Sequence, residues 1–288
     1  MTEVPLSLGQ ALGWAREQID GVDARALLCH VAECSHATLS GFPERMLTHP
    51  QARTFERLVE RRLIGEPIAY LVGAREFYSR RFRVGAGVLI PRPETEVLVE
   101  EALRRVAGRE QLRVLDLGTG SGILAITLAL ELGARAESVV AVDRSAEALG
   151  YAVWNAGALG ARVDFREGDW LAGLEGYQFD LVVSNPPYVA DGDPHLARGD
   201  LRFEPVSALA SGPAGLDDIR LIARSLGPHL AAGAWVLIEH GWDQAADVRA
   251  ILASAGLAQV GSADDLAGIS RVSFGRRRID GTSAIAVD

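Results

Sequence analysis

The sequence contains no lysine, so all 29 of its basic side chains are arginines. Its 38 acidic residues outnumber them, and the formal net charge is −9 at pH 7. An acidic balance argues against nonspecific binding to DNA or RNA, because that affinity depends on cationic side chains that meet phosphates. We therefore expect no stable association with nucleic acid.

Cysteine is also scarce, and Cys29 and Cys34 are the only two. Both fall in a segment typical of a helix, and no second cysteine pair lies near them. The spacing therefore does not favour a metal site. We predict that they are thiols of the core in a reducing cytoplasm.

Long apolar runs are absent. The longest, residues 123–132, is interrupted by Glu131 and is typical of a buried helix rather than of a membrane span. The first residues lack the basic stretch and apolar core of a secretory signal. We expect a cytoplasmic protein that makes no contact with a membrane. Its 288 residues suffice for one large domain or two smaller ones.

The first part of the chain, residues 1–75, has the pattern of a small helical bundle. Ser7 and Asp23 are candidate caps for two helices, and a third helix follows Pro50 and ends near Gly65. Residues 76–90 then alternate between apolar and polar side chains, which predicts a β-hairpin that links this bundle to the rest. A further helix is expected to begin at Thr95.

From there to residue 277, strand and helix patterns alternate, which predicts an α/β domain. We expect a mostly parallel, Rossmann-like sheet of seven strands, whose last two leave little room for a helix between them and form an antiparallel edge. Arg276, Arg277 and Arg278 are predicted to form a solvated strand end, and residues 278–288 a flexible tail. The strands are placed near residues 113–117, 138–142, 162–166, 179–184, 234–239, 257–261 and 270–275.

Several of these strands end in residues typical of a nucleotide-like site. The first ends in a turn with Gly118, Gly120 and Gly122, which lets the backbone approach a ligand at the start of a helix. Glycine turns of this kind bind NAD, FAD or S-adenosylmethionine in different proteins. In others they only allow a strand and a helix to pack tightly. Asp143 ends the second strand, where a carboxylate can accept both ribose hydroxyls or can cap a helix. Trp170 follows the third strand, as a stacking partner for a purine or as a core residue.

The fourth strand ends in Asn185, Pro186, Pro187 and Tyr188. Two prolines in succession lack N–H groups and have fixed φ angles, so this turn is stiff and its carbonyls stay available. The side-chain oxygen of Asn185 and the carbonyl of Pro186 can each accept one N–H of a primary amide, which would hold its nitrogen in place. Tyr188 could stack on the flat amide, or serve as an ordinary core tyrosine.

The order of these motifs resembles the class I S-adenosylmethionine-dependent methyltransferases. Within that class, the stretches GEPIAYLVGAREFY, VLIPRPETE, LDLGTGSG, SNPPYV, FEPVSALASGPAGL and IEHG resemble the release-factor glutamine methyltransferases, the PrmC/HemK family. The match runs from about Gly65 to Gly241 and extends loosely over the helical bundle, which that family also has. The pairing of RPETE with NPPY is its distinctive feature.

The resemblance implies an enzyme of translation termination. It would transfer a methyl group from S-adenosyl-L-methionine to the glutamine of the GGQ motif in class-1 release factors, with S-adenosyl-L-homocysteine as the other product. Residues 1–75 would help to bind the release factor, and residues 91–277 would form the methyltransferase domain. Asn185, Pro186 and Tyr188 would be catalytic, and with Pro187 they would bind the substrate. The cofactor would be bound by Gly118, Thr119, Gly120, Ser121, Gly122, Asp143, Trp170 and Asn185.

Two alternatives stay open. An adenine-N6 or other exocyclic-amino methyltransferase acting on DNA or RNA could use the same acceptors on a flipped base. A nucleotide-binding or assembly protein without transfer activity would need the glycine turn but not Asn185. Among weaker candidates, Arg92 and Glu94 could shape the mouth of the site or form a structural ion pair. Glu239 and His240 are expected mainly to anchor a loop.

Overall fold

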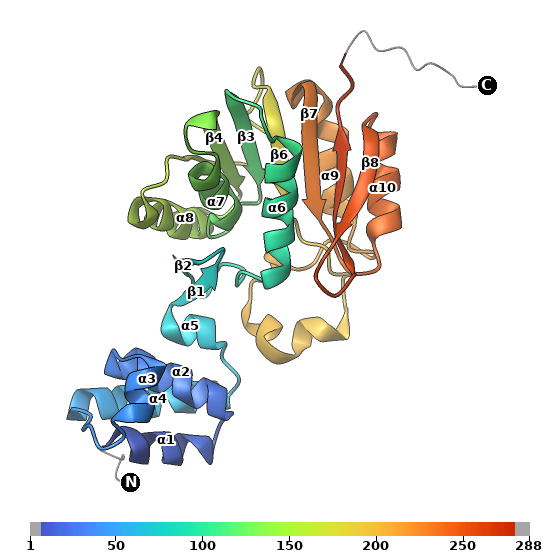
Figure 1. Ribbon diagram of the computed structural model, residues 1–288. Coiled ribbons are helices and arrows are strands. Elements are labelled where there is room, and N and C mark those ends of the chain that lie inside the picture. The colour runs from blue at the N-terminus through green and yellow to red at the C-terminus, as the bar shows by residue number, and fades with distance from the viewer. Residues whose placement is uncertain (1–6, 280–288) are drawn as a thin grey trace. The chain divides into compact units, whose positions relative to one another are not determined.

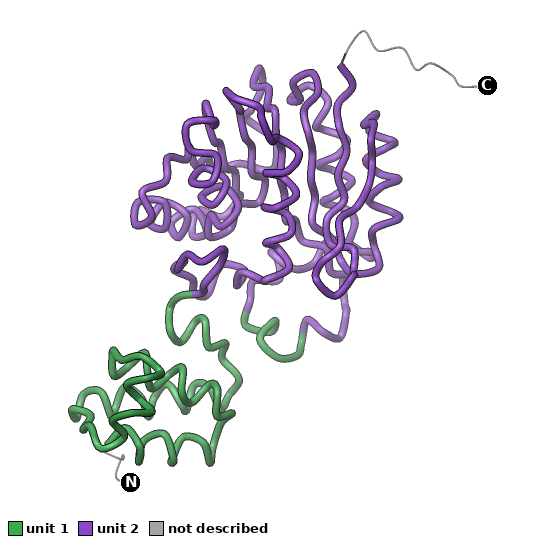
Figure 2. The backbone as a smooth tube through the Cα atoms, in the orientation of Figure 1, with its two compact units in different colours: residues 1–74, 197–203 green, residues 75–196, 204–288 purple. Residues whose placement is uncertain are grey.

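The structure is a computed structural model that describes residues 7–279, and the predicted tail lies largely outside them. The chain divides into two compact units (Figure 2). One contains the chain up to Ala74 together with the separate segment Ala197–Phe203, and the other contains Arg75–Leu196 and everything from Glu204 onward. In the part of the chain that is described, no helix combines the length and the apolar composition that a membrane span needs.

The first unit is a helical bundle around a core that includes Leu8, Leu28 and Phe55. Ser7 caps the first helix, as predicted, but Asp20 rather than Asp23 caps the second. The sequence prediction also missed two short helices. The helices are α1 (Leu8–Arg16), α2 (Gly21–Ala32), α3 (His36–Gly41), α4 (His49–Leu63) and α5 (Ile68–Val72).

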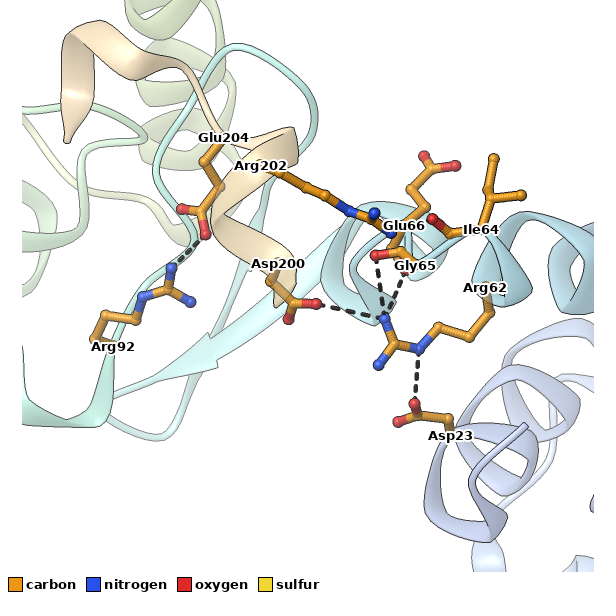
Figure 3. A network of polar contacts seen from close by, with 9 residues as sticks. All are labelled: Asp23, Arg62, Ile64, Gly65, Glu66, Arg92, Asp200, Arg202 and Glu204. Atoms are coloured by element: carbon orange, nitrogen blue, oxygen red, sulfur yellow. Dashed lines mark hydrogen bonds and ion pairs between the residues drawn. The ribbon is translucent and has the colours of Figure 1, made fainter. Parts of the chain in front are cut away.

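Asp23 has a different role, because it binds an arginine of α4. Arg62 Nε donates to Asp23 Oδ2 at 2.7 Å, and its Nη1 lies 3.4 Å from Asp200 Oδ1 (Figure 3). Arg202 donates to the carbonyl of Ile64. These contacts attach the segment Ala197–Phe203 to the helical unit, although both of its chain neighbours belong to the other unit.

The hairpin is shorter than predicted. Strands β1 (Ala74–Phe77) and β2 (Arg80–Arg83) form a two-stranded sheet, and no strand covers residues 84–90. There the backbone turns instead, with Val88 N donating to Gly85 O. Asn155 secures the end of β2, since its side chain accepts from Arg83 N at 2.7 Å and donates to Arg83 O at 3.0 Å.

The second unit is built on a seven-stranded sheet of order β5-β4-β3-β6-β7-β9-β8. The first five strands in this order are parallel, and β9 runs antiparallel to β7 and β8. The predicted α/β sheet with an antiparallel edge is thus confirmed. Its strands are β3 (Leu112–Leu117), β4 (Ala136–Asp143), β5 (Asp164–Glu167), β6 (Phe179–Ser184), β7 (Leu230–Glu239), β8 (Ala258–Asp264) and β9 (Ser270–Arg276).

Helices cover both faces of this sheet (Figure 1). One apolar cluster packs α6, α7 and part of α8 on one face, and a second packs α9 and α10 on the other. The helices are α6 (Glu96–Arg105), α7 (Ile123–Leu132), α8 (Ala146–Leu159), α9 (Asp217–Ser225) and α10 (Ala245–Ser254). Short 3-10 turns lie at Pro93–Thr95, Gly133–Arg135, Pro194–Ala197, Gly199–Phe203, Val206–Ala208 and Gly227–His229.

Two smaller predictions need correction. Arg276 and Arg277 are not simply solvated, because their side chains donate to backbone carbonyls of residues 227, 230 and 233. Cys29 and Cys34 are free thiols, but they are half-buried at the margin of the helical core rather than inside it. Burial is the main cause that raises the pKa of Cys29 to about 11, which keeps this thiol protonated at neutral pH.

Candidate active site

The carboxyl ends of the parallel strands meet at one edge of the sheet. Leu117 pairs with Val142 on one side and with Ser184 on the other, so the loops that follow β3, β4 and β6 start side by side. A cavity of about 280 Å³ opens there. The predicted residues that line it are Arg92, Gly118, Thr119, Gly120, Ser121, Asp143, Trp170, Asn185 and Pro187, whereas Glu94, Gly122, Pro186 and Tyr188 are not part of its lining.

The glycine turn is tied to the neighbouring strand. The N–H groups of Gly118 and Thr119 both donate to the carbonyl of Val142, at 2.9 and 3.0 Å. Gly118 has φ +73°, and a Cβ at this position would lie 3.2 Å from the ring of Trp170. Because only glycine combines a left-handed backbone with so close an approach, this position requires it.

Gly122 serves helix packing instead. It is the N-cap of α7, with φ +86°, and a Cβ there would lie 3.2 Å from the Cα of Ala152 on α8. The third glycine of the turn therefore lets α7 and α8 approach each other, while the first two face the cavity.

Sequence reasoning overlooked Asp116, which supports the turn from β3. Its Oδ2 accepts from Thr119 Oγ1 at 2.7 Å and from Ala125 N at 3.1 Å. The side chain is fully buried, and this burial raises its pKa to about 7 although both hydrogen bonds lower it. A carboxylate between the apolar residues Leu115 and Leu117 was the signal that could have revealed it.

Asp143 lies at the end of β4 with both oxygens turned to backbone donors. Oδ2 accepts from Gly120 N at 2.8 Å and Oδ1 from Ser145 N at 2.9 Å. Each carboxylate oxygen can accept a second hydrogen bond, so the group can still bind two hydroxyls of a ligand in the cavity. Ser145, not Asp143, caps α8 by accepting from Ala148 N.

Replacing Asp143 with alanine should therefore weaken binding of S-adenosylmethionine by about 10- to 100-fold, since hydrogen bonds to a charged acceptor contribute about 1.5–3 kcal/mol. Isothermal titration of the folded variant would measure the change in Kd. Asp143→Asn keeps one acceptor oxygen and should give an intermediate loss. Binding as tight as that of the unaltered protein would contradict a ribose contact.

Trp170 is fixed in the cavity wall. Its indole N–H donates to Asp218 Oδ1 at 3.2 Å, and its backbone has φ +53°. With the polar edge of the ring held in this way, an apolar part of the ring is available to a flat base. Trp170 both lines the cavity and packs against the core on this face of the sheet, so its stacking role stays a prediction.

The side-chain amide of Asn185 is hydrogen-bonded through its NH₂ group, and its oxygen has no partner among the described residues. Nδ2 donates to Thr95 Oγ1 at 3.3 Å, whereas Oδ1 is buried with no hydrogen-bond partner among residues 7–279. A buried unsatisfied acceptor costs free energy. A donor from a ligand in the adjoining cavity would satisfy it.

Tyr188 is held at both its hydroxyl and its carbonyl. The hydroxyl donates to Glu239 Oε1 at 3.3 Å, and the carbonyl accepts from Gln244 Nε2 at 3.0 Å. Burial, followed by the charge of Glu239, raises the pKa of the phenol far above its usual value, so it stays neutral. The stacking role of Tyr188 stays a prediction.

The weaker candidates have clear partners. Arg92 forms an ion pair with the buried carboxylate of Glu204 (Figure 3), so the carboxylate in its ion pair is Glu204 rather than Glu94. Glu204 also accepts from Ile90 N at 2.9 Å. His240 is completely buried between the carbonyl of Gly241 and Ser273 Oγ, and burial lowers its pKa. It is therefore a neutral structural histidine.

The cavity fits an adenosine-based donor such as S-adenosylmethionine. Gly118 and Gly120 leave room for close approach, Asp143 offers paired acceptors, and Trp170 offers an aromatic wall. Asn185 and Pro187 line the same cavity, so a methyl donor and an acceptor amide could meet there.

Comparisons with known proteins agree with this geometry. The sequence model described as Methyltransferase small domain matches residues 93–200, and the one described as PrmC N-terminal domain matches residues 7–73. A solved methyltransferase from Pyrococcus furiosus has the same fold, with a TM-score of 0.53 at 18% identity over 76% of this chain and 98% of that one. Fold and site together define an S-adenosylmethionine-dependent methyltransferase of the Rossmann-like class.

The particular family follows from closer relatives. A release factor glutamine methyltransferase of Xylella fastidiosa is 49% identical over 92% of this chain and 96% of that protein. The one from Escherichia coli is 41% identical over 91% of this chain and 97% of that protein. The chain belongs to the release factor glutamine methyltransferase family.

Proposed function

We propose that this protein transfers the methyl group of S-adenosylmethionine to the side-chain amide nitrogen of the GGQ glutamine in class-1 release factors, which gives N5-methylglutamine. The observation that carries this proposal is the buried Oδ1 of Asn185 beside the cavity, which has no hydrogen-bond partner in the described part of the chain. This oxygen can accept a hydrogen bond from an N–H group of a ligand bound at the carboxyl edge of the sheet. The family relationship specifies whose amide supplies that donor.

The site acts on a weak nucleophile. The nitrogen of a primary amide shares its lone pair with the carbonyl, so it must be held in place. S-adenosylmethionine supplies a methyl group made electrophilic by its sulfonium. Asn185 Oδ1 accepts one N–H, and the carbonyl of Pro186, which lies in the chain between two lining residues but is not part of the lining itself, is predicted to accept the other. Together they fix the NH₂ group and raise the electron density on nitrogen. Orientation of this kind contributes roughly 7–11 kcal/mol in favourable systems, so no strong base is needed. The proton leaves after the nitrogen is methylated.

The same acceptors select glutamine over glutamate. A carboxylate has only hydrogen-bond acceptors, and the groups proposed to face it, Asn185 Oδ1 and the Pro186 carbonyl, are acceptors too. Each buried polar group left without a hydrogen bond costs about 1–3 kcal/mol of binding free energy. A release factor with glutamate at the GGQ position has no amide nitrogen to methylate, and its carboxylate should also bind poorly beside these acceptors.

The helical unit is proposed to bind the release factor. Besides its buried core, it exposes a set of apolar side chains, and exposed apolar surface often marks contact with a protein partner. Because its substrate acts on the ribosome, the enzyme is expected to work in the cytoplasm without stable binding to nucleic acid. The exposed apolar side chains are Val22, Phe42, Met46, Leu63 and Ile64.

Transfer of a labelled methyl group tests this function. The protein is incubated with labelled S-adenosylmethionine and a release factor, its GGQ→GGA variant, or duplex DNA. Label should appear on the unaltered factor alone, because only it presents the glutamine amide. Label on DNA but not on the factor would favour an exocyclic-amino methyltransferase and would refute the proposal.

A further inference from the structure

Glu239 is a buried carboxylate next to the proposed amide site. It ends β7 with 2% of its surface exposed, and its Oε2 has no hydrogen-bond partner within the described part of the chain. Burying a carboxylate is costly, and an apolar side chain would serve packing better. The residue therefore needs an explanation beyond the loop-anchoring role expected from the sequence.

Glu239 is connected to both polar side chains of the turn Asn185–Tyr188, directly to Tyr188 and through Thr95 to Asn185. The Tyr188 hydroxyl donates to it directly, at 3.3 Å. Thr95 forms the second connection. Its oxygen accepts from Asn185 Nδ2 at 3.3 Å, and its hydroxyl lies close enough to Glu239 for donation from it to lower the pKa of that carboxyl. Thr95 stands at the N-cap of α6 but makes no capping hydrogen bond, so its hydroxyl is available for these contacts.

The charge of Glu239 decides which group donates and which accepts in the hydrogen bonds that connect Glu239, Thr95 and Asn185. A charged carboxylate only accepts hydrogen bonds, so the Thr95 hydroxyl must donate to it. The Thr95 oxygen can then act only as an acceptor, and Asn185 must present its NH₂ group to it. This leaves Asn185 Oδ1 on the opposite side of the amide, where it has no partner among the described residues.

We propose that Glu239 and Thr95 are positioning residues, which orient the Asn185 amide so that its oxygen, and not its NH₂ group, faces the substrate. The inference rests on the proposed function and specifies what prepares the acceptor before substrate binds. It also gives a physical reason for the joint presence of RPETE and NPPY, because Thr95 lies in the first motif and Asn185 in the second.

The proposal predicts a dependence on pH. Burial raises the pKa of Glu239 to about 7, although hydrogen bonds from Thr95 and Tyr188 lower it. Of the other charged groups that face it, Glu94 raises this pKa and Arg271 lowers it. Above the pKa the carboxylate is charged and the direction of the contacts holds. Below it, a protonated Glu239 can donate to Thr95, which then can donate to Asn185 Oδ1.

Single-turnover methyl transfer to a release factor, measured between pH 6 and 9 at saturating S-adenosylmethionine, tests the proposal. Thr95→Val and Glu239→Gln should lower the rate constant at high pH by about 10- to 100-fold, the scale of a small misplacement in a reactive pair. Thr95→Ser keeps the hydroxyl and should retain activity. The fall in rate toward low pH should disappear in Glu239→Gln. If it persists there, Asp116, whose pKa is also about 7, causes it and the proposal fails.

Asp180→Asn is the matched control for loss of a buried carboxylate. Asp180 belongs to β6, at the end of the strand remote from Asn185, and it pairs with Arg109 and Arg113. This substitution should lower the melting temperature but leave the pH profile unchanged. A changed profile would mean that any loss of stability alters the rate, and would overturn the assignment to Glu239.

A second measurement needs no activity. Asn155 and Asn185 are the only asparagines in the sequence, so selective ¹⁵N labelling of asparagine gives two side-chain amide signals. The Asn185 signal should shift with pH around the pKa of Glu239 in the unaltered protein and should stop doing so in Glu239→Gln, while Asn155 serves as the internal reference. An Asn185 signal that ignores pH and both substitutions would refute the proposal even if the enzyme is active. Absence of methyl transfer by the unaltered protein would instead refute the proposed function.

Discussion

Replacing Asn185 with alanine should lower the rate of methyl transfer by about 100- to 1,000-fold, the effect of removing one preorganised hydrogen-bonding group from an active site. The substitution removes the free Oδ1 acceptor, so one N–H of the substrate amide loses its partner. Binding of S-adenosylmethionine should change little, because Asp143, Trp170 and the glycine turn line the remainder of the cavity. Single-turnover transfer and the Kd for the methyl donor measure the two effects separately.

The control for this experiment is the substrate. The GGA variant of the release factor should give no label with either enzyme, and the melting temperature of the Asn185→Ala variant should lie close to that of the unaltered protein. Retained transfer to the GGQ factor by a folded Asn185→Ala protein would mean that the proposed amide acceptor is wrong.

Replacing Gly215 with alanine should be among the most damaging changes outside the cavity. A Cβ at this position would lie 2.1 Å from the carbonyl oxygen of Tyr188 and 2.8 Å from Gln244 Nε2, which binds that same oxygen. The backbone of the turn would have to move. We expect a loss of roughly 2–5 kcal/mol in the free energy of unfolding, from overpacking and from a Cβ in a left-handed conformation. Denaturant unfolding measures this loss.

Gly160→Ala separates these two causes. Gly160 has φ +71°, close to the +67° of Gly215, but no atom lies within 4 Å of its added Cβ. Gly160→Ala should therefore lower the free energy of unfolding only by the cost of a Cβ in a left-handed conformation, about 1–2 kcal/mol. Methyl transfer should fall in Gly215→Ala under conditions where both variants are folded. Equal destabilisation and equal activity of the two variants would show that the contact with Tyr188 does not constrain the turn.

The parts of the fold that depend on local pattern could be predicted from the sequence. β6 was placed at residues 179–184, where the structure has it, because an uninterrupted apolar run ends abruptly at Asn185 and two prolines. The glycine turn after β3 and the antiparallel edge were likewise evident from spacing. Such patterns arise from residues that are neighbours in the chain, so they can be recognised in a single sequence.

Features that depend on distant partners could not be predicted. Thr95 was expected only to begin a helix, because nothing near it indicates that its hydroxyl binds Asn185, 90 residues away. Asp23 was mistaken for a cap for the same reason, since its partner Arg62 is 39 residues away. The predicted hairpin extended too far because residues 84–90 alternate in polarity while their glycines allow a turn.

The segment Ala197–Phe203 is synthesised long after the helices that it contacts. A ribosome releases the helices of the first unit before it makes any strand of the large sheet, yet Asp200 and Arg202 emerge only after β3, β4, β5 and β6. The helical unit therefore acquires its last pieces when most of the other unit already exists. Cutting the gene after residue 74 would yield a fragment in which Arg62 lacks one of its two carboxylates, so the two units are not separable as consecutive pieces of the chain.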